Sequence, residues 1–133
     1  MTWQYNGSIL TSAPEEYQGF VYEITDTVNN KLYIGKKLFW TIQKQKPLKG
    51  RVNRRHRRVE TDWQDYYGSS DALNQQISIH GKPHFQRQIL FMCANKTQMS
   101  YYETREQFAR DVLLDKSYYN GFIGCKITSR GLK

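Results

Sequence analysis

The chain has 133 residues, of which 38% are hydrophobic and 14% aromatic, and its formal net charge is +8 at pH 7. This length suits one domain with a sizeable buried core, and the aromatic content argues against intrinsic disorder. The positive charge favours an anionic partner, nucleic acid above all, although a basic surface can also serve solubility alone.

Neither the cysteines nor the hydropathy pattern points to secretion or to a membrane. Cys93 and Cys125 are far apart in sequence and make neither a disulfide framework nor a zinc motif, so we expect reduced thiols in the core. The N-terminus lacks a charged region followed by an apolar core, and no apolar run approaches the ~20 residues of a membrane span. We therefore expect a cytoplasmic protein without a signal peptide.

The first informative stretch, residues 19–37, reads GFVYEITDTVNNKLYIGKK and predicts a β-hairpin. Residues 20–24 and 31–34 are short runs rich in β-branched and aromatic side chains. Between them, Asn29-Asn30 tolerates the positive φ angles of a tight turn. Residues 1–18, which precede the hairpin, show little pattern and are assigned as an N-terminal extension without chemistry.

The hairpin carries side chains that could do chemistry. Tyr22 lies on the first predicted strand and Tyr33 on the second, and Lys36 and Lys37 follow at once. Two hydroxyls beside cations could bind a phosphodiester and take part in proton transfer. A free tyrosine has a pKa near ~10, so a phenolate at neutral pH requires a nearby cation or metal. The alternative is an ordinary amphipathic hairpin whose tyrosines pack in the core.

The segment 36–60 is the most basic part of the chain. From Lys36 to Arg58 there is no acidic residue, and this window holds half of all lysines and arginines. Like charges this dense repel one another unless a polyanion neutralises them. We interpret the segment as a DNA-binding insertion that is mobile alone and becomes ordered on nucleic acid, the alternative being a solvated loop. The residues assigned to nucleic-acid binding are Lys44, Lys46, Lys49, Arg51, Arg54, Arg55, His56, Arg57 and Arg58. Nothing in the segment predicts base-specific contacts.

The rest of the chain alternates helices and strands. Ser70 is a plausible N-cap for a helix over residues 71–80, and the apolar run 85–93 predicts a buried central strand. A second helix is predicted over about 98–114, followed by a short last strand over 122–127.

Two motifs and their surroundings resemble the GIY-YIG nuclease family. Phe20-Val21-Tyr22 stands where the family has its first motif, Tyr33-Ile34-Gly35 matches the second, and a Tyr-Gly-Ser turn, a helix and a strand follow in family order. One departure is Phe20 at the family's glycine position, with Gly19 one residue early. The resemblance implies a single small α/β (α+β) domain over residues 1–133, with a three-stranded, mostly antiparallel central sheet flanked by helices.

The resemblance also implies a set of site residues. In the family a helix-borne glutamate holds one divalent metal, Mg²⁺ or Mn²⁺, and an asparagine follows the helix. Glu103 is the implied metal ligand and Glu106 the runner-up, while an exposed glutamate paired with an arginine is the structural alternative for either. Asn120 matches the family asparagine, although it also suits a turn.

The catalytic set implied by the resemblance therefore contains two tyrosines, two lysines, a glutamate and an asparagine. These residues are Tyr22, Tyr33, Lys36, Lys37, Glu103 and Asn120. One tyrosine would activate water and the lysines would steady the scissile phosphate. The family arginine that follows the second motif cannot be aligned, so Lys36, Lys37, Arg54 and Arg55 remain candidates for its role.

The implied activity is metal-dependent hydrolysis of DNA phosphodiester bonds by a phage-encoded, homing-endonuclease-like protein. DNA is the expected partner, with a possible homodimer on it and no membrane association. A non-catalytic nucleic-acid-binding module of the same fold is the first alternative. A structural protein that meets an acidic protein surface is the second.

Overall fold

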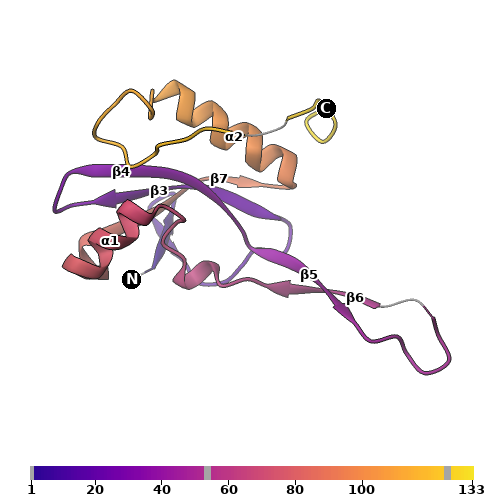
Figure 1. Cartoon of the computed structure of the whole chain (residues 1–133). Coiled ribbons are helices and arrows are strands. Elements are labelled where there is room, and N and C mark those ends of the chain that lie inside the picture. Colours follow the sequence, from indigo (N-terminus) through magenta and orange to yellow (C-terminus); the bar gives the residue numbers. More distant parts are fainter. Residues whose placement is uncertain (1, 53–54, 125–126) are drawn as a thin grey trace.

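A computed structural model describes residues 2–52, 55–124 and 127–133 (Figure 1). It contains a mixed five-stranded sheet of order β2-β1-β7-β3-β4 and a separate two-stranded ribbon, β5-β6. The strands of the sheet are β1 (Trp3–Tyr5), β2 (Ser8–Leu10), β3 (Gly19–Asp26), β4 (Lys31–Leu38) and β7 (Phe85–Cys93). No helix in these described ranges is long and apolar enough to cross a membrane.

The predicted hairpin forms one side of the sheet, with β4 at the edge. β3 pairs antiparallel with β4 on one side and with β7 on the other, so these three strands have the predicted antiparallel arrangement. Asn30 adopts the positive φ expected of the turn, at 55°. The Asp26 carboxylate accepts hydrogen bonds from the backbone of Val28 at 2.9 Å and Asn29 at 3.0 Å, and thereby holds the turn.

The N-terminal extension adds two strands that the sequence did not predict. β1 pairs parallel with β7, with Trp3 beside Arg87, and β2 pairs antiparallel with β1. The predicted three-stranded sheet is thus one of five strands. Strands of three residues are too short to show a period-two pattern, but Trp3 is 1% exposed and its indole donates to the Trp63 carbonyl at 2.6 Å.

Each face of the sheet is covered by one helix (Figure 1). Side chains alternate along β3, so Phe20, Tyr22 and Ile24 enter the core that contains Leu73 and Ile77 of α1 (Asp71–His80). Val21 enters the second core with Met99 of α2 (Lys96–Ala109). Ser70 caps α1 as predicted, since its hydroxyl accepts from the Leu73 amide at 3.3 Å.

The region after α2 differs from the prediction. The helix ends at Ala109 instead of near residue 114, and Asp111 has a positive φ of 51° that reverses the chain. None of the described residues in the predicted last strand, 122–124 and 127, is in a strand. Instead Tyr118 forms a single bridge with Leu32 of β4. Cys93 is a buried free thiol as expected, and Cys125 lies outside the described residues.

The basic segment also differs from the expected mobile arm. It forms an antiparallel ribbon of β5 (Trp40–Gln45) and β6 (Arg55–Glu60), which projects from the sheet in Figure 1. At its root, the Arg58 guanidinium lies 4.5 Å from the centre of the Trp40 ring and donates to the carbonyls of Glu15 and Tyr17. The two short 3₁₀ helices are η1 (Trp63–Asp65) and η2 (Lys82–His84).

Candidate active site

Tyr22 lies at the centre of the predicted site and is 1% exposed. Its partner across the strand pair is Gly35, and a Cβ atom built on Gly35 would lie 2.6 Å from Cζ of Tyr22. Gly68, with a φ of +88°, approaches from the other side, where its Cβ would lie 3.3 Å from the Tyr22 hydroxyl. Glycine at position 35 is therefore required to accommodate the first tyrosine.

A β-bulge lies at the same point of the sheet. The register between β3 and β7 shifts between Val21 and Tyr22, because Val21 pairs with Phe91 while Tyr22 pairs with Ile89. A bulge bends a strand and changes the direction of neighbouring side chains. Bulges of this kind are frequent next to active sites.

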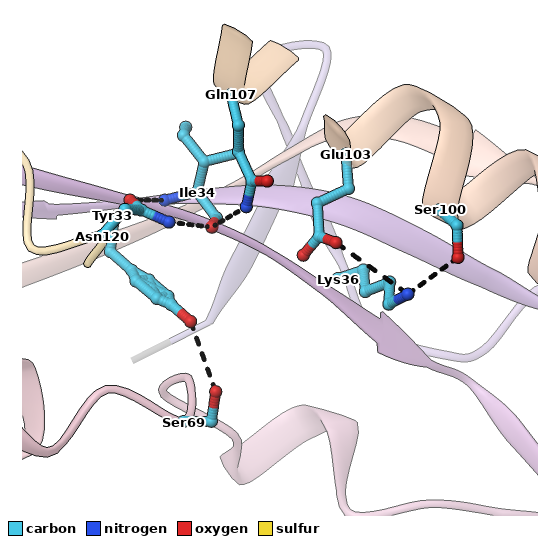
Figure 2. A network of polar contacts seen from close by, with 8 residues as sticks. All are labelled: Tyr33, Ile34, Lys36, Ser69, Ser100, Glu103, Gln107 and Asn120. Atoms are coloured by element: carbon cyan, nitrogen blue, oxygen red, sulfur yellow. Dashed lines mark hydrogen bonds and ion pairs between the residues drawn. The ribbon is translucent and has the colours of Figure 1, made fainter. Parts of the chain in front are cut away.

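Tyr33 and Tyr66 surround Tyr22. The Tyr33 ring stacks on Tyr22 with centroids 6.2 Å apart, and the Tyr66 ring meets Tyr22 edge-on at 6.1 Å. The Tyr33 hydroxyl lies 3.3 Å from the Ser69 hydroxyl (Figure 2). Tyr22 is enclosed, whereas Tyr33 is only partly buried. Tyr33 is thus the predicted tyrosine that substrate could reach.

Both tyrosines favour the neutral phenol. Burial raises the pKa of Tyr22 well above its usual range, and the neighbouring Tyr66 raises it further. Burial also raises the pKa of Tyr33, while its hydrogen bond with Ser69 lowers it in part. The negative charge of Glu103 also contributes to the raised pKa of both tyrosines. The hydroxyls therefore act as hydrogen-bonding groups in the protein alone.

Glu103 extends from α2 toward β4 (Figure 2). Its side chain is 15% exposed, and Lys36 Nζ lies 3.9 Å from its carboxylate and donates to the Ser100 hydroxyl at 2.8 Å. Burial raises the pKa of the Glu103 carboxyl, and the positive charge of Lys36 opposes that shift. A partly desolvated carboxylate with one distant cation is poorly neutralised, so a divalent ion would be a favourable partner.

The donor set fits a weakly held Mg²⁺ ion. No group of three or more possible metal ligands occurs in the described ranges, so Glu103 would be a carboxylate ligand outside any such group. Mg²⁺ keeps several of its waters and is commonly held by one or two carboxylates together with substrate phosphates. The site accordingly suits an ion that is completed by water and by the substrate.

The runner-up, Glu106, has a different environment. Arg110 Nε donates to its carboxylate at 2.8 Å, and the same guanidinium contacts Glu23 of β3. Burial lowers the pKa of Arg110, but the two carboxylates raise it more. This network attaches α2 to the sheet. Glu106 thus matches the arginine-paired alternative, whereas Glu103 pairs with Lys36 of β4.

Asn120 contacts the edge of the sheet. Its amide accepts from the Ile34 amide at 3.0 Å and donates to the Ile34 carbonyl at 2.8 Å (Figure 2). Gln107 of α2 donates to the same carbonyl at 3.1 Å. These contacts fix the segment of β4 between Tyr33 and Gly35. The amide was predicted to orient a glutamate or a phosphate, and its observed contacts instead make it a positioning residue for β4.

The two lysines lie on opposite faces of β4. Lys37 shares the tyrosine face, where its ammonium lies 2.7 Å from Asp62 and 4.2 Å from the centre of the Tyr66 ring. Lys36 faces α2. Both line an open cleft of about 500 Å³ at the root of the ribbon, with Leu38, Thr41, Thr61, Asp62 and Met99. Their ion pairs are with Glu103 and Asp62, so neither ammonium group is paired with Tyr22 in the protein alone.

Sequence reasoning missed Tyr66, Ser69, Ser100, Gln107 and Asp62 as neighbours of the site. The stretch WQDYYGSS, which supplies Tyr66 and Ser69, was interpreted only as a turn before α1. Its position near Tyr22 depends on the positive φ of Gly68, and a local sequence pattern does not show which strand such a turn approaches.

The residues predicted to bind nucleic acid have three different environments. The side chains of Lys44, Lys46, Lys49, Arg51, His56 and Arg57 are exposed on the ribbon and its tip. Arg58 is held at the root by Trp40 and two backbone carbonyls. Arg54 and the side chain of Arg55 lie outside the described part of the chain, so the structure does not place either as the family arginine.

Comparison with known proteins gives one match. The family described as putative endonuclease segE, GIY-YIG domain, matches residues 3–123. No curated protein and no solved structure matches the chain. The matched region begins within β1 and includes every strand and helix described above.

Proposed function

Because the chain belongs to the GIY-YIG endonuclease family, we propose that it is a metal-dependent endonuclease that hydrolyses DNA phosphodiester bonds. The observation that carries this proposal is the position of Glu103. Its carboxylate extends from α2 to β4, beside Lys36, and its charge raises the pKa of both tyrosines. A carboxylate, hydroxyls and cations next to an open cleft are the groups that phosphodiester hydrolysis needs.

Each side chain has a role in the proposed reaction. Glu103 would hold Mg²⁺ or Mn²⁺, which supplies positive charge to the scissile phosphate and the leaving oxygen. Tyr33, the more accessible tyrosine, would orient the attacking water through its hydroxyl. The Tyr22 ring stacks against the Tyr33 ring and supports it. Asn120 holds the backbone of β4 at Ile34, between Tyr33 and Gly35. Lys37 would exchange its contact with Asp62 for a phosphate oxygen.

In this proposal the ribbon binds the phosphate backbone of DNA. Its exposed lysines and arginines would neutralise phosphates, so binding should weaken steeply with salt. One site acts on one strand, and we propose that a homodimer on DNA would bring two sites to the duplex. A phage-encoded, homing-endonuclease-like enzyme acting in the host cytoplasm is the biological setting that we infer from the family and the basic charge.

Cleavage of a supercoiled plasmid tests the proposal. The full chain is incubated with plasmid and Mg²⁺, and in parallel with EDTA, while binding to the same DNA is measured in EDTA. We expect relaxed or linear product with Mg²⁺ only. Salt-sensitive binding without product under Mg²⁺ or Mn²⁺, on plasmid, branched DNA and RNA alike, would contradict the nuclease and support the non-catalytic module.

A further inference from the structure

The two faces of the ribbon carry different chemistry. Opposite residues of an antiparallel pair share a face, and neighbours along a strand alternate between faces. The register pairs Thr41 with Val59 and Gln43 with Arg57, so these four residues lie on one face. We call it the amide–guanidinium face, after Gln43 and Arg57. The opposite face carries Lys44 with His56 and Ile42 with Arg58.

The opposite face is held at its root, whereas the amide–guanidinium face is open. Arg58 lies on the Trp40 ring and donates to the carbonyls of Glu15 and Tyr17, so its face rests against the N-terminal segment. Gln43 and Arg57 are exposed, and neither side chain makes a hydrogen bond or ion pair with any residue in the described ranges. Their polar groups are available to a ligand.

The amide–guanidinium face continues into the open cleft at the root of the ribbon. Thr41, two residues before Gln43 on the same face, lines this cleft together with Lys36 and Lys37. A polyanion that lies in the cleft would therefore extend along Gln43 and Arg57. Figure 1 shows that the ribbon leads away from the sheet at this point.

We propose that the ribbon enters the major groove of duplex DNA and that Gln43 and Arg57 contact base edges there, as specificity-determining residues. The major groove of B-DNA, about 12 Å wide, admits a two-stranded ribbon. A glutamine amide pairs in bidentate fashion with adenine, and an arginine guanidinium with guanine. This inference rests on the proposed function for the DNA substrate, but it does not require catalysis.

The geometry also limits where the recognised bases lie. Gln43 on the ribbon lies six positions after Lys37 in the cleft. Six steps of about 3.3 Å along an extended strand span roughly 20 Å. One base pair occupies about 3.4 Å along the duplex axis. The bases contacted by Gln43 and Arg57 should thus lie within about six base pairs of the cut phosphate.

Selection from a randomised duplex library tests the inference. The full chain is bound to the library in EDTA, so that DNA is retained uncut, and enriched sequences are determined for wild type, Arg57→Ala and Gln43→Ala. We expect wild type to enrich a short motif with a guanine and a nearby adenine. Arg57→Ala removes the guanidinium and should reduce the guanine preference at least about tenfold, and Gln43→Ala should do the same for the adenine.

Lys44→Ala is the matched control, because Lys44 lies on the opposite face of the same ribbon. It should weaken binding equally for all sequences, lower the salt slope by about one, and leave the motif unchanged. A wild type without any motif, or a motif unchanged by Arg57→Ala, would overturn the inference. A motif that depends on Arg57 in a protein that cuts nothing would retain the inference and reject only the nuclease.

Discussion

Tyr22 and Gly35 form a close-packed unit at the residue scale. The glycine of the second motif lies directly opposite the tyrosine of the first, and the tyrosine side chain covers it. Spacing along the sequence brings the two motifs together, but this contact explains why one of them must contain glycine. Without a side chain at Gly35, the Tyr22 ring can lie close to β4. The Tyr33 ring stacks on the Tyr22 ring in this position.

Replacing Gly35 with alanine should therefore disturb the site and the fold together. The new Cβ would lie 2.6 Å from Cζ of Tyr22, which must move within a closed core. We expect a loss of about 1–3 kcal/mol in the free energy of unfolding, measured by urea denaturation. Gly121→Ala is the control, because no atom lies within 4 Å of its built Cβ, and it should cost less than about 0.5 kcal/mol. Equal costs for the two variants would contradict this packing.

Glu103 should lower the stability of the free protein at neutral pH. Burial raises the pKa of its carboxyl in the folded state, so the folded state holds the proton at a pH where the unfolded chain has released it. The stability that comes from the protonated form is present below the unfolded pKa of about 4.3 and is lost as pH rises through the folded pKa. Glu103→Gln should therefore raise the melting temperature at pH 7, and the gain should vanish near pH 4.

The same melting measurement reports metal binding. Adding Mg²⁺ at a hundred times its Kd should stabilise wild type by about 2.7 kcal/mol and leave Glu103→Gln unchanged. Glu106→Gln is the matched control, because it removes a partner of Arg110 and should not gain stability at pH 7. A Mg²⁺ response that persists in Glu103→Gln would identify a different ligand.

At the scale of elements, the ribbon shows that neighbouring arginines can have opposite roles. Arg57 and Arg58 are adjacent on β6 but lie on different faces. Arg58 is held by Trp40 and the carbonyls of Glu15 and Tyr17, whereas the Arg57 side chain makes no hydrogen bond or ion pair with the described residues. The sequence-based prediction assigned both arginines to phosphate binding and did not distinguish them.

Arg58→Ala should destabilise the protein by about 1 kcal/mol, since a stacking contact and hydrogen bonds to the N-terminal segment are lost. Arg57→Ala should change stability by less than about 0.5 kcal/mol and weaken DNA binding instead. Chemical denaturation and a DNA-binding titration on both variants check this. If Arg57→Ala were the more destabilising, the assigned faces of the ribbon would be wrong.

Elements with strong local signals could be predicted from the sequence. The helix over residues 71–80 has the predicted bounds, because Ser70 caps its N-terminus. The strand over residues 85–93 has them too, because a continuous apolar run forms it. The ribbon was missed because its strands repeat charged and polar residues, which signal solvent exposure more than pairing. The described residues of the predicted last strand, 122–124 and 127, are not in a strand, and just before them the Asn120 side chain bonds the backbone of Ile34 on β4.

The site was predictable in part for a related reason. Tyr22, Tyr33 and Glu103 lie on regular elements whose motifs are visible in the sequence. Tyr66 and Ser69 reach the site from a loop, and their closeness to Tyr22 and Tyr33 is a long-range contact that no local pattern records. Asn120 was recognised as a site residue, but its contact with the backbone of β4 appears only in three dimensions.

At the scale of the whole molecule, Tyr119 links the chain after α2 to the central hairpin. Its hydroxyl donates to Asp26 at 2.6 Å, and its amide donates to the Leu32 carbonyl at 2.8 Å. Burial raises the pKa of Asp26, but the hydrogen bonds from Tyr119, Asn29 and the backbone lower it more, so the net pKa is below its usual value. This contact also holds Asn120, the next residue, near β4.

Acid should therefore weaken the fold through Asp26. A carboxylate with a lowered folded pKa contributes stability above its unfolded pKa of about 3.9, and this is lost as pH falls through the folded pKa. Tyr119→Phe should cost about 1.5–3 kcal/mol at pH 7, and its stability should fall less steeply than that of wild type below about pH 4. Tyr101→Phe, at a more exposed tyrosine, is the control in the urea denaturation series. Parallel pH curves for wild type and Tyr119→Phe would contradict this role of Asp26.

The account as a whole depends on Glu103 as the group that supports hydrolysis. The most direct measurement is Mg²⁺-dependent plasmid cleavage by wild type, Glu103→Gln and Glu106→Gln under the same conditions. The two glutamates lie on the same helix, but Glu103 pairs with Lys36 of β4, whereas Glu106 pairs with Arg110. We predict product from wild type and Glu106→Gln and at least about a hundredfold slower cleavage by Glu103→Gln, comparable to loss of an essential charge-stabilising group. Wild-type cleavage rates in Glu103→Gln, with loss in Glu106→Gln, would contradict the account.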